Sequence, residues 1–576
     1  MYSFSNKEIA EMLSEYTDLM KIMGENKYRV RAYDNASRIV SDRTIDLEKM
    51  VKEDRLKEIK GIGEGIAGTI KDIFAKGYCE PLEDLRKELP PGFEELLNIP
   101  GLGPKPAGKF LEELEISNID ELKQALKDQK IRELKGMGAK TEENLLEALK
   151  EYEEYTSYIN LDQAIRTSDK LIKELKEKSD EILDLETAGS TRRKKIKIGD
   201  IDILMSVKDK KDHNILETIK SLEPIKDILL EGDTKISART QEGLQVDFRI
   251  VNQDEYPAAL LYFTGSKYHN VKLRQIAKDK GYKLNEYGVF AGEDRIEADS
   301  EEEIYKLLDL KYMEPEIRED RGEVEASQND SLPKLITLND IKGDMHVHSD
   351  YSDGSMSIDD MVKAAKKRDY KYIAFTDHSQ SLNIANGLSE KRVKEQWEEI
   401  EEIRKKHPDF LILKGIEVDI KKDGSLDYSD EILEGFDIVI ASVHANFNLP
   451  KDEMTERIIK AIKSPYVDII GHPTGRMLGQ RQPFEFDYEQ VLEACKENDV
   501  VLEINASPSR FDLNDIMAKD AISAEVKLII NTDSHHSDQY NYMRYGVFIA
   551  RRAWAEKENI VNTYSIEEIK QLFEVK

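Results

Sequence analysis

Short apolar runs alternate with amphipathic helical stretches throughout residues 340–576, and this alternation is the feature that most restricts how the chain can fold. Strands that are separated by helices pair in parallel, and the helices then cover the sheet. The alternation therefore predicts a parallel α/β domain with a barrel-like form. The apolar runs are YIAFTDH (372–378), FLILKGIEVDI (410–420), DIVIASVHA (437–445), VDIIGHP (467–473), VVLEINAS (500–507) and VKLIINTDSHH (526–536).

Length and composition indicate that this domain is one of several. A chain of 576 residues is too long for one core, so we expect three to five domains. No run of about 18 apolar residues occurs and the N-terminus lacks the regions of a signal peptide, so we expect no membrane partner. Two cysteines, Cys79 and Cys495, are too few for a disulfide framework or thiolate zinc sites and favour a reducing cytoplasm.

The net charge of −30 does not exclude a nucleic-acid partner. Strong average acidity normally argues against binding a polyanion. The charge is unevenly spread, however, because KYRVRAY (27–33) and TRRKKIK (191–197) are basic stretches that could face phosphates. Acidity alone therefore decides nothing about the partner.

The first 150 residues read as helices joined by short turns, and one glycine pattern recurs in them three times. IKGIGEGIAGTI (59–70), IPGLGPKPAGKF (99–110) and LKGMGAKTEENL (134–145) each place two glycines before a helical run. Three copies in under 90 residues are an internal repeat. The paired glycines are Gly61 and Gly63, Gly101 and Gly103, and Gly136 and Gly138.

The repeat favours binding to a DNA backbone. One copy matches the dinucleotide fingerprint GxGxxG from Gly63 to Gly68, but the preceding residues 51–60 are charged and helical instead of forming a strand. Two short helices joined by a glycine hairpin would let the backbone approach a phosphate, with helix N–H groups pointing at it. The pattern resembles helix-hairpin-helix motifs, which bind DNA without reading its sequence. The alternative is a plain glycine turn between packed helices, which three copies disfavour.

Three aspartates of the middle segment form a candidate metal site. DIDILMSV (200–207) and LQVDFRIV (244–251) read as strands. Asp200 and Asp202 are two residues apart and would leave one face of the first strand, while Asp247 lies among apolar residues, where an uncompensated carboxylate is costly. Together they could hold two divalent ions for an in-line displacement at phosphorus. A D-x-D pair on a solvated strand is common, so the triad alone is a weak indication.

The surrounding sequence strengthens this interpretation. AGSTRRKKIKIGDIDIL (188–204) resembles the nucleotidyltransferase palm of family X DNA polymerases, the polymerase beta type, and LYFTGSKYHN (261–270) resembles their nucleotide-pocket segment. The resemblance extends from about residue 5 to IREDRGE (317–323). It implies a DNA-directed DNA polymerase that uses dNTPs and holds Mg²⁺ or Mn²⁺ with Asp200, Asp202 and Asp247.

The same resemblance implies roles for residues around these ions and along the DNA. It assigns triphosphate binding to Gly189, Ser190 and Arg193. It assigns the wall that disfavours ribonucleotides to Tyr262, Phe263 and Gly265. Asn270 and Arg274 would touch the nascent base pair and template. Na⁺ or K⁺ would be held against the DNA backbone by the carbonyls of Lys57, Ile59, Ile62, Leu97, Ile99 and Leu102. Lys27 and Tyr33 would bind a 5′-phosphate end, and the six hairpin glycines would contact DNA.

Two positions depart from the family pattern. Thr69 stands where members with deoxyribose phosphate lyase activity carry a Schiff-base lysine, and Gly65 replaces a neighbouring basic residue. This puts lyase activity in doubt, although Lys71 lies close by. Lys194 replaces the usual glycine after the Arg-Arg pair.

Histidines form a second candidate site. Eight of the ten lie after residue 340, and most stand at strand ends, where α/β folds place active sites. In GDMHVHSDYSDG (343–354), His346 and His348 alternate on one strand and would leave one face, whereas Asp344 and Asp350 receive no role. The set suits two or three ions such as Zn²⁺ or Mn²⁺. His213, His407 and His536 are interpreted as ordinary core or surface residues.

This second set resembles the PHP (polymerase and histidinol phosphatase) domain, a distorted (β/α)₇ barrel with a trinuclear centre, over roughly 340–576. The resemblance implies one ion on His346, His348, Glu417 and Asp533, a second on Glu417, His444 and His472, and a third on Asp353, His378 and His535. Asp353 stands where some members have histidine, so the third site offers harder ligands. The chemistry implied is metal-hydroxide attack on a phosphoester, as a Mn²⁺-stimulated 3′→5′ exonuclease or 3′-end phosphodiesterase.

We therefore expect a multidomain α+β and α/β chain. The predicted divisions are a helical DNA-binding domain (1–82), a fingers-type domain with two hairpins (83–150), a palm (151–252), a nucleotide-selecting thumb-like subdomain (253–318), a flexible linker (319–338) and the PHP domain (339–576). The function expected is filling of short gaps in DNA repair, by a monomer acting on gapped DNA with a 5′-phosphate. The alternatives are a phosphoesterase whose polymerase half serves as a DNA-binding module, and a non-catalytic DNA scaffold.

Overall fold

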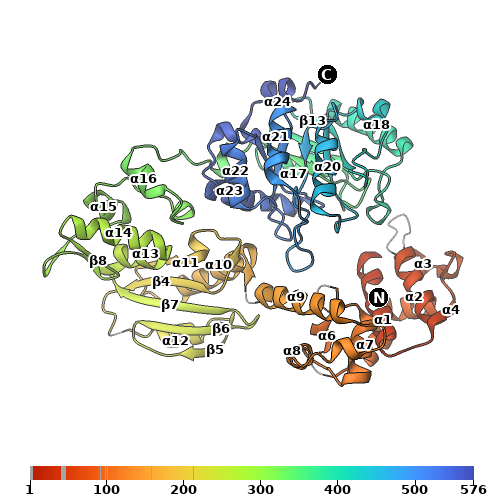
Figure 1. Ribbon diagram of the computed structural model, residues 1–576, viewed down its shortest axis with the longest axis horizontal. Coiled ribbons are helices and arrows are strands. Elements are labelled where there is room, and N and C mark those ends of the chain that lie inside the picture. The colour runs from red at the N-terminus through yellow and green to blue at the C-terminus, as the bar shows by residue number, and fades with distance from the viewer. Residues whose placement is uncertain are drawn as a thin grey trace. The chain divides into compact units, whose positions relative to one another are not determined.

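The computed structural model describes residues 4, 6–40, 47–90, 93–97, 99, 101–156, 158–211 and 213–575. The chain forms two compact units, Met1–Thr156 and Ser157–Lys576. Figure 1 shows the helical first unit in red to orange and the second unit in yellow to blue. Among the described helices, none combines the length and apolar character needed to cross a membrane.

The first unit is helical. Its α1 packs against α2, α5 and α7, and one apolar core that includes Leu13, Phe74 and Phe110 runs through the whole unit. The boundary that we predicted after residue 82 falls inside α5, because Pro81 lies in the first turn of that helix, where its missing N–H costs nothing. The α-helices are α1 (Asn6–Ile22), α2 (Lys27–Val40), α3 (Leu47–Lys52), α4 (Glu64–Lys76), α5 (Glu80–Glu88), α6 (Phe93–Leu96), α7 (Pro104–Leu114), α8 (Ile119–Lys127) and α9 (Ala139–Thr156).

The second unit begins with a five-stranded sheet in the order β2-β4-β7-β6-β5. The central pair β4·β7 is parallel and the other pairs are antiparallel. Both predicted strands are present, as β4 and β7. The palm that we predicted to begin at residue 151 begins later, because α9 continues to Thr156. The elements are β1 (Ile159–Asn160), α10 (Leu161–Lys178), β2 (Asp184–Thr187), α11 (Gly189–Arg192), β3 (Lys197–Ile198), β4 (Ile201–Val207), α12 (Ile215–Lys220), β5 (Ile225–Leu230), β6 (Lys235–Thr240) and β7 (Gln245–Asn252).

A smaller helical subdomain follows, with a three-stranded antiparallel sheet and its own apolar cluster. The segment that we predicted as a flexible linker (319–338) contains the short helix α16 where it leaves this subdomain. Two of its charged residues are paired with the preceding helix α14: the buried Glu323 contacts His269, and Asp320 contacts Lys272. The elements are α13 (Tyr256–Thr264), α14 (Lys267–Asp279), β8 (Lys283–Asn285), β9 (Gly288–Ala291), β10 (Asp294–Ile296), α15 (Glu301–Leu307) and α16 (Glu323–Gln328).

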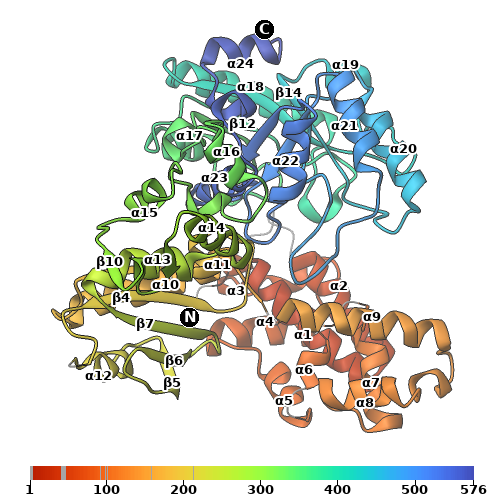
Figure 2. The ribbon, with the colours of Figure 1, turned by 60° about the vertical axis from the view of Figure 1, so that its left-hand side comes forward.

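The remainder is a seven-stranded parallel barrel, which confirms the fold predicted from the alternation. Its strands follow one another in chain order, and the first and last meet through a bridge between Val347 and Ser534. In Figure 2 the helices of this part surround the strands. The strands are β11 (Gly343–Val347), β12 (Tyr372–Phe375), β13 (Leu411–Asp419), β14 (Ile438–Ser442), β15 (Ile469–Ile470), β16 (Val501–Asn505) and β17 (Leu528–Asn531).

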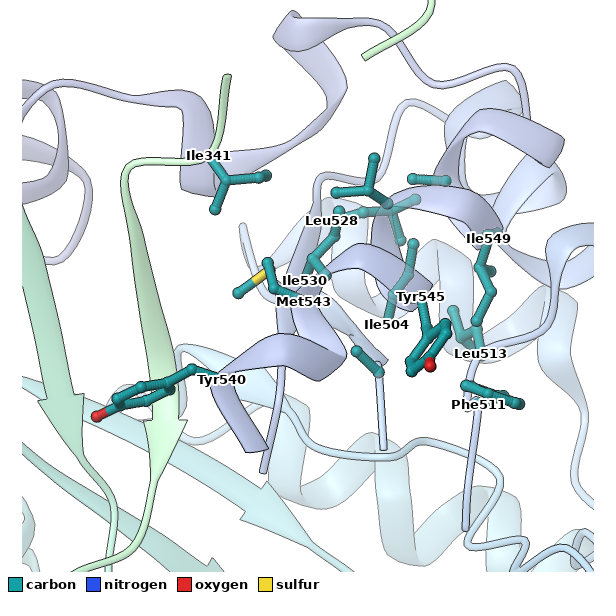
Figure 3. Close-up of a cluster of buried hydrophobic side chains, with 14 of the residues drawn as sticks. Ile341, Ile504, Phe511, Leu513, Leu528, Ile530, Tyr540, Met543, Tyr545 and Ile549 are labelled. Atoms are coloured by element: carbon teal, nitrogen blue, oxygen red, sulfur yellow. The ribbon is translucent and has the colours of Figure 1, made fainter. Parts of the chain in front are cut away.

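Helices connect the barrel strands and pack against them. The last long one, α23, presses Met543, Tyr545 and Ile549 onto residues of β16, β17 and the loop after β16, as Figure 3 shows. This packing fixes α23 to the barrel wall. The barrel helices are α17 (Ile358–Lys366), α18 (Glu390–Lys406), α19 (Asp430–Leu433), α20 (Lys451–Ile462), α21 (Tyr488–Glu497), α22 (Asp515–Ser523), α23 (Met543–Arg552) and α24 (Ile566–Leu572).

Two candidate metal centres and a nucleotide pocket

The three predicted aspartates converge on the palm sheet. Asp202 on β4 and Asp247 on β7 are register partners on parallel strands, so their side chains share one face. Asp200 stands one residue before β4. One ligand oxygen from each residue lies within 4.8 Å of the others. The triad is therefore a candidate site for divalent cations, which bind carboxylate oxygens.

The electrostatics of the triad fit a cation. Burial and the charges of Asp200 and Asp247 raise the pKa of Asp202 to about 7, and burial and Asp247 raise the pKa of Asp200. The pKa of Asp247 is lowered despite burial, because Lys235, Ser237 and Gln245 hydrogen-bond to its carboxylate. Lys235 Nζ lies 2.6 Å from Asp247 Oδ2. A divalent cation among these carboxylates would relieve their mutual repulsion.

Gly189 lies directly against the triad. A Cβ atom on this residue would stand 2.2 Å from Asp202 Oδ2, and its φ of +57° belongs to the left-handed region. Ser190 follows it in the short helix α11, at half-buried depth. The predicted phosphate-binding pair is therefore adjacent to the predicted metal ligands.

The pocket residues predicted from LYFTGSKYHN also gather. Tyr262, Asn270 and Arg274 line one small cavity together with Ala258, Leu261, Leu284 and Asn285. Asn270 Nδ2 donates to the carbonyl oxygen of Tyr262 over 2.7 Å. The rings of Tyr262 and Phe263 pack edge to face, with their centroids 5.3 Å apart. Gly265 has φ +70°, and a Cβ there would stand 3.2 Å from Arg193 Nη1. The glycine thus makes room for the predicted triphosphate ligand.

A buried charge network that the sequence did not reveal lies behind this pocket. Arg192 Nη2 lies 2.7 Å from Glu301 Oε2, and Arg318 Nη1 lies 2.5 Å from Glu301 Oε1. Although burial opposes it, the two guanidinium groups lower the pKa of Glu301 to about 2. These residues are distant in sequence and belong to no local pattern, so only the fold brings them together.

In the barrel, Glu417 is the point on which the histidines converge. Its Oε1 lies 2.8 Å from His472 Nε2 and 3.2 Å from His444 Nε2. Its Oε2 lies 2.8 Å from His378 Nδ1 and 3.4 Å from His346 Nε2. One carboxylate therefore contacts histidines from four strand ends, as a bridging ligand would.

The remaining predicted ligands complete the cluster. His348 Nε2 lies 3.1 Å from Asp533 Oδ1, and Asp353 Oδ2 lies 3.1 Å from His535 Nε2 and 3.7 Å from His378 Nε2. All nine residues are thus brought together. Eight of them form overlapping groups rather than three separate ones: His348, Asp353, His378 and His535; His346, His348 and Asp533; His378, Glu417 and His444. His472 joins them through its contact with Glu417.

The donor atoms of this cluster fit bound cations. His346 Nε2, both ring nitrogens of His348, His444 Nε2 and Glu417 Oε2 are buried and make no hydrogen bond in the described structure. Buried polar atoms without partners are unfavourable unless something coordinates them. The surrounding imidazoles hold the pKa of Glu417 and that of Asp533 well below their usual ranges, despite burial. Both carboxylates are therefore kept in their ligating form.

Two carboxylates missed in the sequence orient these histidines. Glu503 Oε1 lies 2.7 Å from His346 Nδ1, and Asp419 Oδ1 lies 2.5 Å from His444 Nδ1. Each contact occupies one ring nitrogen and turns the other toward Glu417. The sequence held a signal for Glu503, since an isolated glutamate in the apolar run VVLEINAS needs a buried partner.

An arginine stands beside the same cluster. Arg510 Nε lies 3.4 Å from Asp533 Oδ2, and Arg510 Nη1 is buried without a hydrogen bond in the described structure.

Asp344, which received no role from the sequence, is fully buried and accepts a hydrogen bond from Thr532. It therefore supports the strand that carries His346 instead of facing solvent.

The three glycine hairpins share one geometry. Gly61, Gly101 and Gly136 have φ values of +101°, +80° and +84°. The turn of each copy is closed by the same hydrogen bond: Ile62 N to Ile59 O at 3.0 Å, Leu102 N to Ile99 O at 3.0 Å, and Met137 N to Leu134 O at 2.9 Å. The predicted repeat is thereby confirmed as a structural one. Lys57 and Leu97, the other predicted carbonyl donors, each lie two residues before the first residue of such a turn.

The second glycine of each hairpin is not required by the protein itself. A Cβ on Gly63, Gly103 or Gly138 would meet nothing within 4 Å, and none of the three has a positive φ. Close approach of an external backbone is a physical reason for glycine at such a place. Gly63 and Gly103 are the N-cap residues of α4 and α7. The first N–H groups of α4 have no intrahelical partners, whereas Pro104 and Pro106 leave Lys105 as the one N–H donor among the first three residues of α7.

The position at which lyase-active family members carry a Schiff-base lysine is occupied by Thr69. The Thr69 and Tyr33 hydroxyls lie 2.9 Å apart, and Tyr33 is 7% exposed. Lys71 pairs with Asp54. Tyr33 is thus largely enclosed, whereas Lys27 is exposed at the start of α2.

Models of four sequence families match the chain. They are a helix-hairpin-helix domain (residues 4–79), a SAM-like helix-hairpin-helix tandem (93–151), the DNA polymerase beta thumb (259–319) and the PHP domain (344–507). The thumb match ends at residue 319, shortly before α16 begins at Glu323.

Similar proteins cover the chain as a whole and in parts. The chain is 38% identical over 569 residues to the DNA polymerase/3′-5′ exonuclease PolX of Bacillus subtilis (strain 168), and the match spans 98% of both chains. The C-terminal part is 33% identical over 235 residues to a probable phosphatase of Thermoanaerobacter sp. (strain X514), covering 38% of this chain and 89% of that one. DNA polymerase lambda of Rattus norvegicus is 24% identical over 289 residues, covering 45% and 48%.

Proposed function

The chain belongs to the family X DNA polymerases that carry a C-terminal PHP domain, and on that premise we propose that it extends DNA at the palm and removes 3′ nucleotides at the barrel. The observation that carries this proposal is the presence of two candidate ligand sets in one chain: Asp200, Asp202 and Asp247 in the palm, and Glu417 with eight further residues in the barrel.

At the palm, the triad would hold two Mg²⁺ or Mn²⁺ ions, which stabilise the charge that develops when a primer 3′-hydroxyl attacks the α-phosphate. Gly189 and Ser190 present the N-terminus of α11 to the triphosphate, and Arg193 supplies a cation beside Gly265. Tyr262 and Phe263 form the wall against the sugar. Asn270 and Arg274, in the adjoining cavity, read the position of the new base pair.

At the barrel, the nine ligands would hold two or three Mn²⁺ or Zn²⁺ ions, which supply a hydroxide for attack on the terminal phosphodiester. Glu417, which contacts histidines through both of its oxygens, would serve two of the ions, and Asp353 would give the third an oxygen ligand. Arg510 places a guanidinium nitrogen beside Asp533, where a non-bridging phosphate oxygen could accept from it.

The helical unit would bind the DNA backbone through its hairpins. Gly63, Gly103 and Gly138 leave open space at turns that precede helix N-termini, which suits a phosphate. The carbonyls of the first two turns would hold Na⁺ or K⁺, and the exposed Lys27 would meet a 5′-phosphate across the gap. Gapped DNA, dNTPs and the monomeric state all belong to this proposal.

The test uses the unsubstituted chain on a one-nucleotide gap with a 5′-phosphate and a 5′-labelled primer, with Mn²⁺ or Mg²⁺. We expect the primer to lengthen by one nucleotide when the complementary dNTP is present, and to shorten stepwise when dNTPs are omitted. Shortening under both conditions would favour the alternative, a phosphoesterase whose polymerase half serves as a DNA-binding module. A primer whose length changes under neither condition would refute both.

A further inference from the structure

One helix of the barrel contacts the palm through residues on a single face. Tyr545, Phe548 and Arg552 of α23 are spaced three and four residues apart, so they lie along one side. The Tyr545 hydroxyl donates to Asp162 Oδ1 of α10 over 2.5 Å. Lys194 Nζ, at the position that departs from the family pattern, lies 5.1 Å from the Phe548 ring centroid. The helix that Figure 3 shows packed on β16 and β17 therefore also meets the loop after α11.

Arg552 is the most deeply enclosed of these contacts, at 2% exposed. Its Nη2 lies 2.8 Å from Asp515 Oδ2 at the start of α22, which holds the guanidinium from the barrel side. Its Nη1 donates to the carbonyl oxygen of Arg193 over 2.6 Å and lies 3.1 Å from Glu319 Oε1. One barrel side chain thus holds both the backbone of Arg193 and a carboxylate beside it.

Glu319 also contacts the side chain of Arg193. Arg193 Nε lies 3.0 Å from Glu319 Oε1, and Arg193 Nη1 donates to the carbonyl oxygen of Thr264, next to Gly265. Although burial opposes it, Arg193 and Arg552 lower the pKa of Glu319, so its charge is maintained. Two edges of the Arg193 guanidinium are therefore fixed, and Nη2 makes no hydrogen bond to the described residues.

We propose that Arg552 of the barrel is a positioning residue for the polymerase: through Glu319 and the Arg193 carbonyl it holds the Arg193 guanidinium ready for the triphosphate of the incoming nucleotide. The proposal rests on the triphosphate role proposed above for Arg193. A long side chain that is fixed before binding loses less rotamer freedom when its ligand arrives. Removing Arg552 should therefore weaken nucleotide binding more than it slows the step at the metal site.

The experiment compares Arg552→Ala with Arg551→Ala in the full chain, by steady-state filling of a one-nucleotide gap. Arg551 is a matched control because it lies on the same helix and contacts the same segment, with Nε 2.8 Å from Glu316 Oε1, yet touches neither Arg193 nor Glu319. For Arg552→Ala we expect KM for the dNTP to rise about tenfold and kcat to change less than about threefold. Arg551→Ala should leave KM within about twofold, and Arg552→Lys should lie between.

Two further variants keep the outcomes separable. Glu319→Ala removes the carboxylate that links Arg552 to Arg193, and it should raise KM for the dNTP similarly. If Arg552→Ala misfolds the barrel and loses 3′ degradation, Glu319→Ala therefore provides the test in its place. The double variant Arg193→Ala/Arg552→Ala should have a KM no higher than that of Arg193→Ala alone, because both changes act on one contact. Inhibition by tripolyphosphate should weaken in parallel with the rise in KM.

A KM unchanged in both Arg552→Ala and Glu319→Ala, with a raised KM in Arg193→Ala, would overturn this inference and leave the role of Arg193 intact. An unchanged KM in Arg193→Ala would overturn the triphosphate role itself, and the inference with it. A fall in kcat alone in Arg552→Ala would also contradict positioning of the nucleotide.

Discussion

Glu503 and His346 form a buried pair in which Glu503 Oε1 lies 2.7 Å from His346 Nδ1, and this pair fixes the nitrogen that faces Glu417. Glu503 also accepts hydrogen bonds from His472 N and Asn531 Nδ2, over 2.6 and 2.9 Å. A glutamine here would turn an N–H toward one of these donors and tilt the histidine. The orientation of the predicted metal ligands therefore depends on Glu503, a residue that is not itself a predicted ligand.

Glu503→Gln should weaken metal binding at the barrel by about 10-fold to 100-fold. The exonuclease activity should fall at low Mn²⁺ and recover at high Mn²⁺, and primer extension should not change. A titration of both activities against Mn²⁺ measures this. Asp468→Asn is the control, since Asp468 accepts from Val439 N at the other end of the barrel strands. Equal effects of the two variants would count against an orienting role.

Asp353→Ala should remove one ion from the barrel. Asp353 contacts His535 and His378, and the remaining ligands of its group are histidines, so no other carboxylate in that group replaces its oxygen. Metal analysis in the Asp202→Ala background counts the barrel ions without those of the palm triad. We expect the count to fall by one and 3′ degradation to fall with it. An unchanged count would show that Asp353 is not a ligand.

Gly189→Ala should abolish most primer extension. The new Cβ would lie 2.2 Å from Asp202 Oδ2 on a backbone at φ +57°, so the metal ligand or the loop must move. A displacement of this order costs about 100-fold in rate. Gly199→Ala is the matched control, because its nearest contacts are Tyr158 carbons at 3.9 Å. Degradation from the 3′ end should persist in both variants, and equal extension rates would contradict the account.

Glu301→Gln should destabilise the thumb-like subdomain at neutral pH. The pKa of Glu301 lies at about 2 in the folded chain, below its ordinary value of 4.5, so its stabilisation is present above about pH 4.5 and is lost as pH falls toward 2. The shift corresponds to about 3 kcal/mol.

Urea unfolding of a Trp397→Phe background measures this, because Trp554 then reports alone and packs against the same apolar cluster. The difference in unfolding free energy between chains with and without Glu301→Gln should shrink between pH 7 and pH 3. A pH-independent difference would mean that the carboxylate charge does not stabilise the network.

Local patterns were enough to predict the strands and the residues that gather at their ends. His346 and His348 alternate at the end of β11, and Asp202 and Asp247 meet because β4 and β7 pair in parallel. Strand ends of one barrel lie at one edge, so residues that follow apolar runs converge without knowledge of any single contact. The family X and PHP resemblance is confirmed by the similar proteins, whereas the individual roles stay predictions.

Contacts between distant segments were beyond the sequence. Glu301 meets Arg192 and Arg318 only once the subdomain has folded, and neither pair has a helical or strand spacing. The charged stretch after Ile317 reads as a linker because charge without periodicity usually indicates solvent exposure. In the folded chain these charges are paired instead, with Glu323 fully buried against His269.

The central claim is that one chain carries two independent metal sites with opposite effects on a primer. The direct measurement is the length of a 5′-labelled primer in gapped DNA, with and without dNTPs, for Asp202→Ala and His348→Ala. Asp202→Ala should lose extension and keep shortening, and His348→Ala should keep extension and lose shortening. If either substitution removed both activities while the protein remained folded, the two-site account would be contradicted.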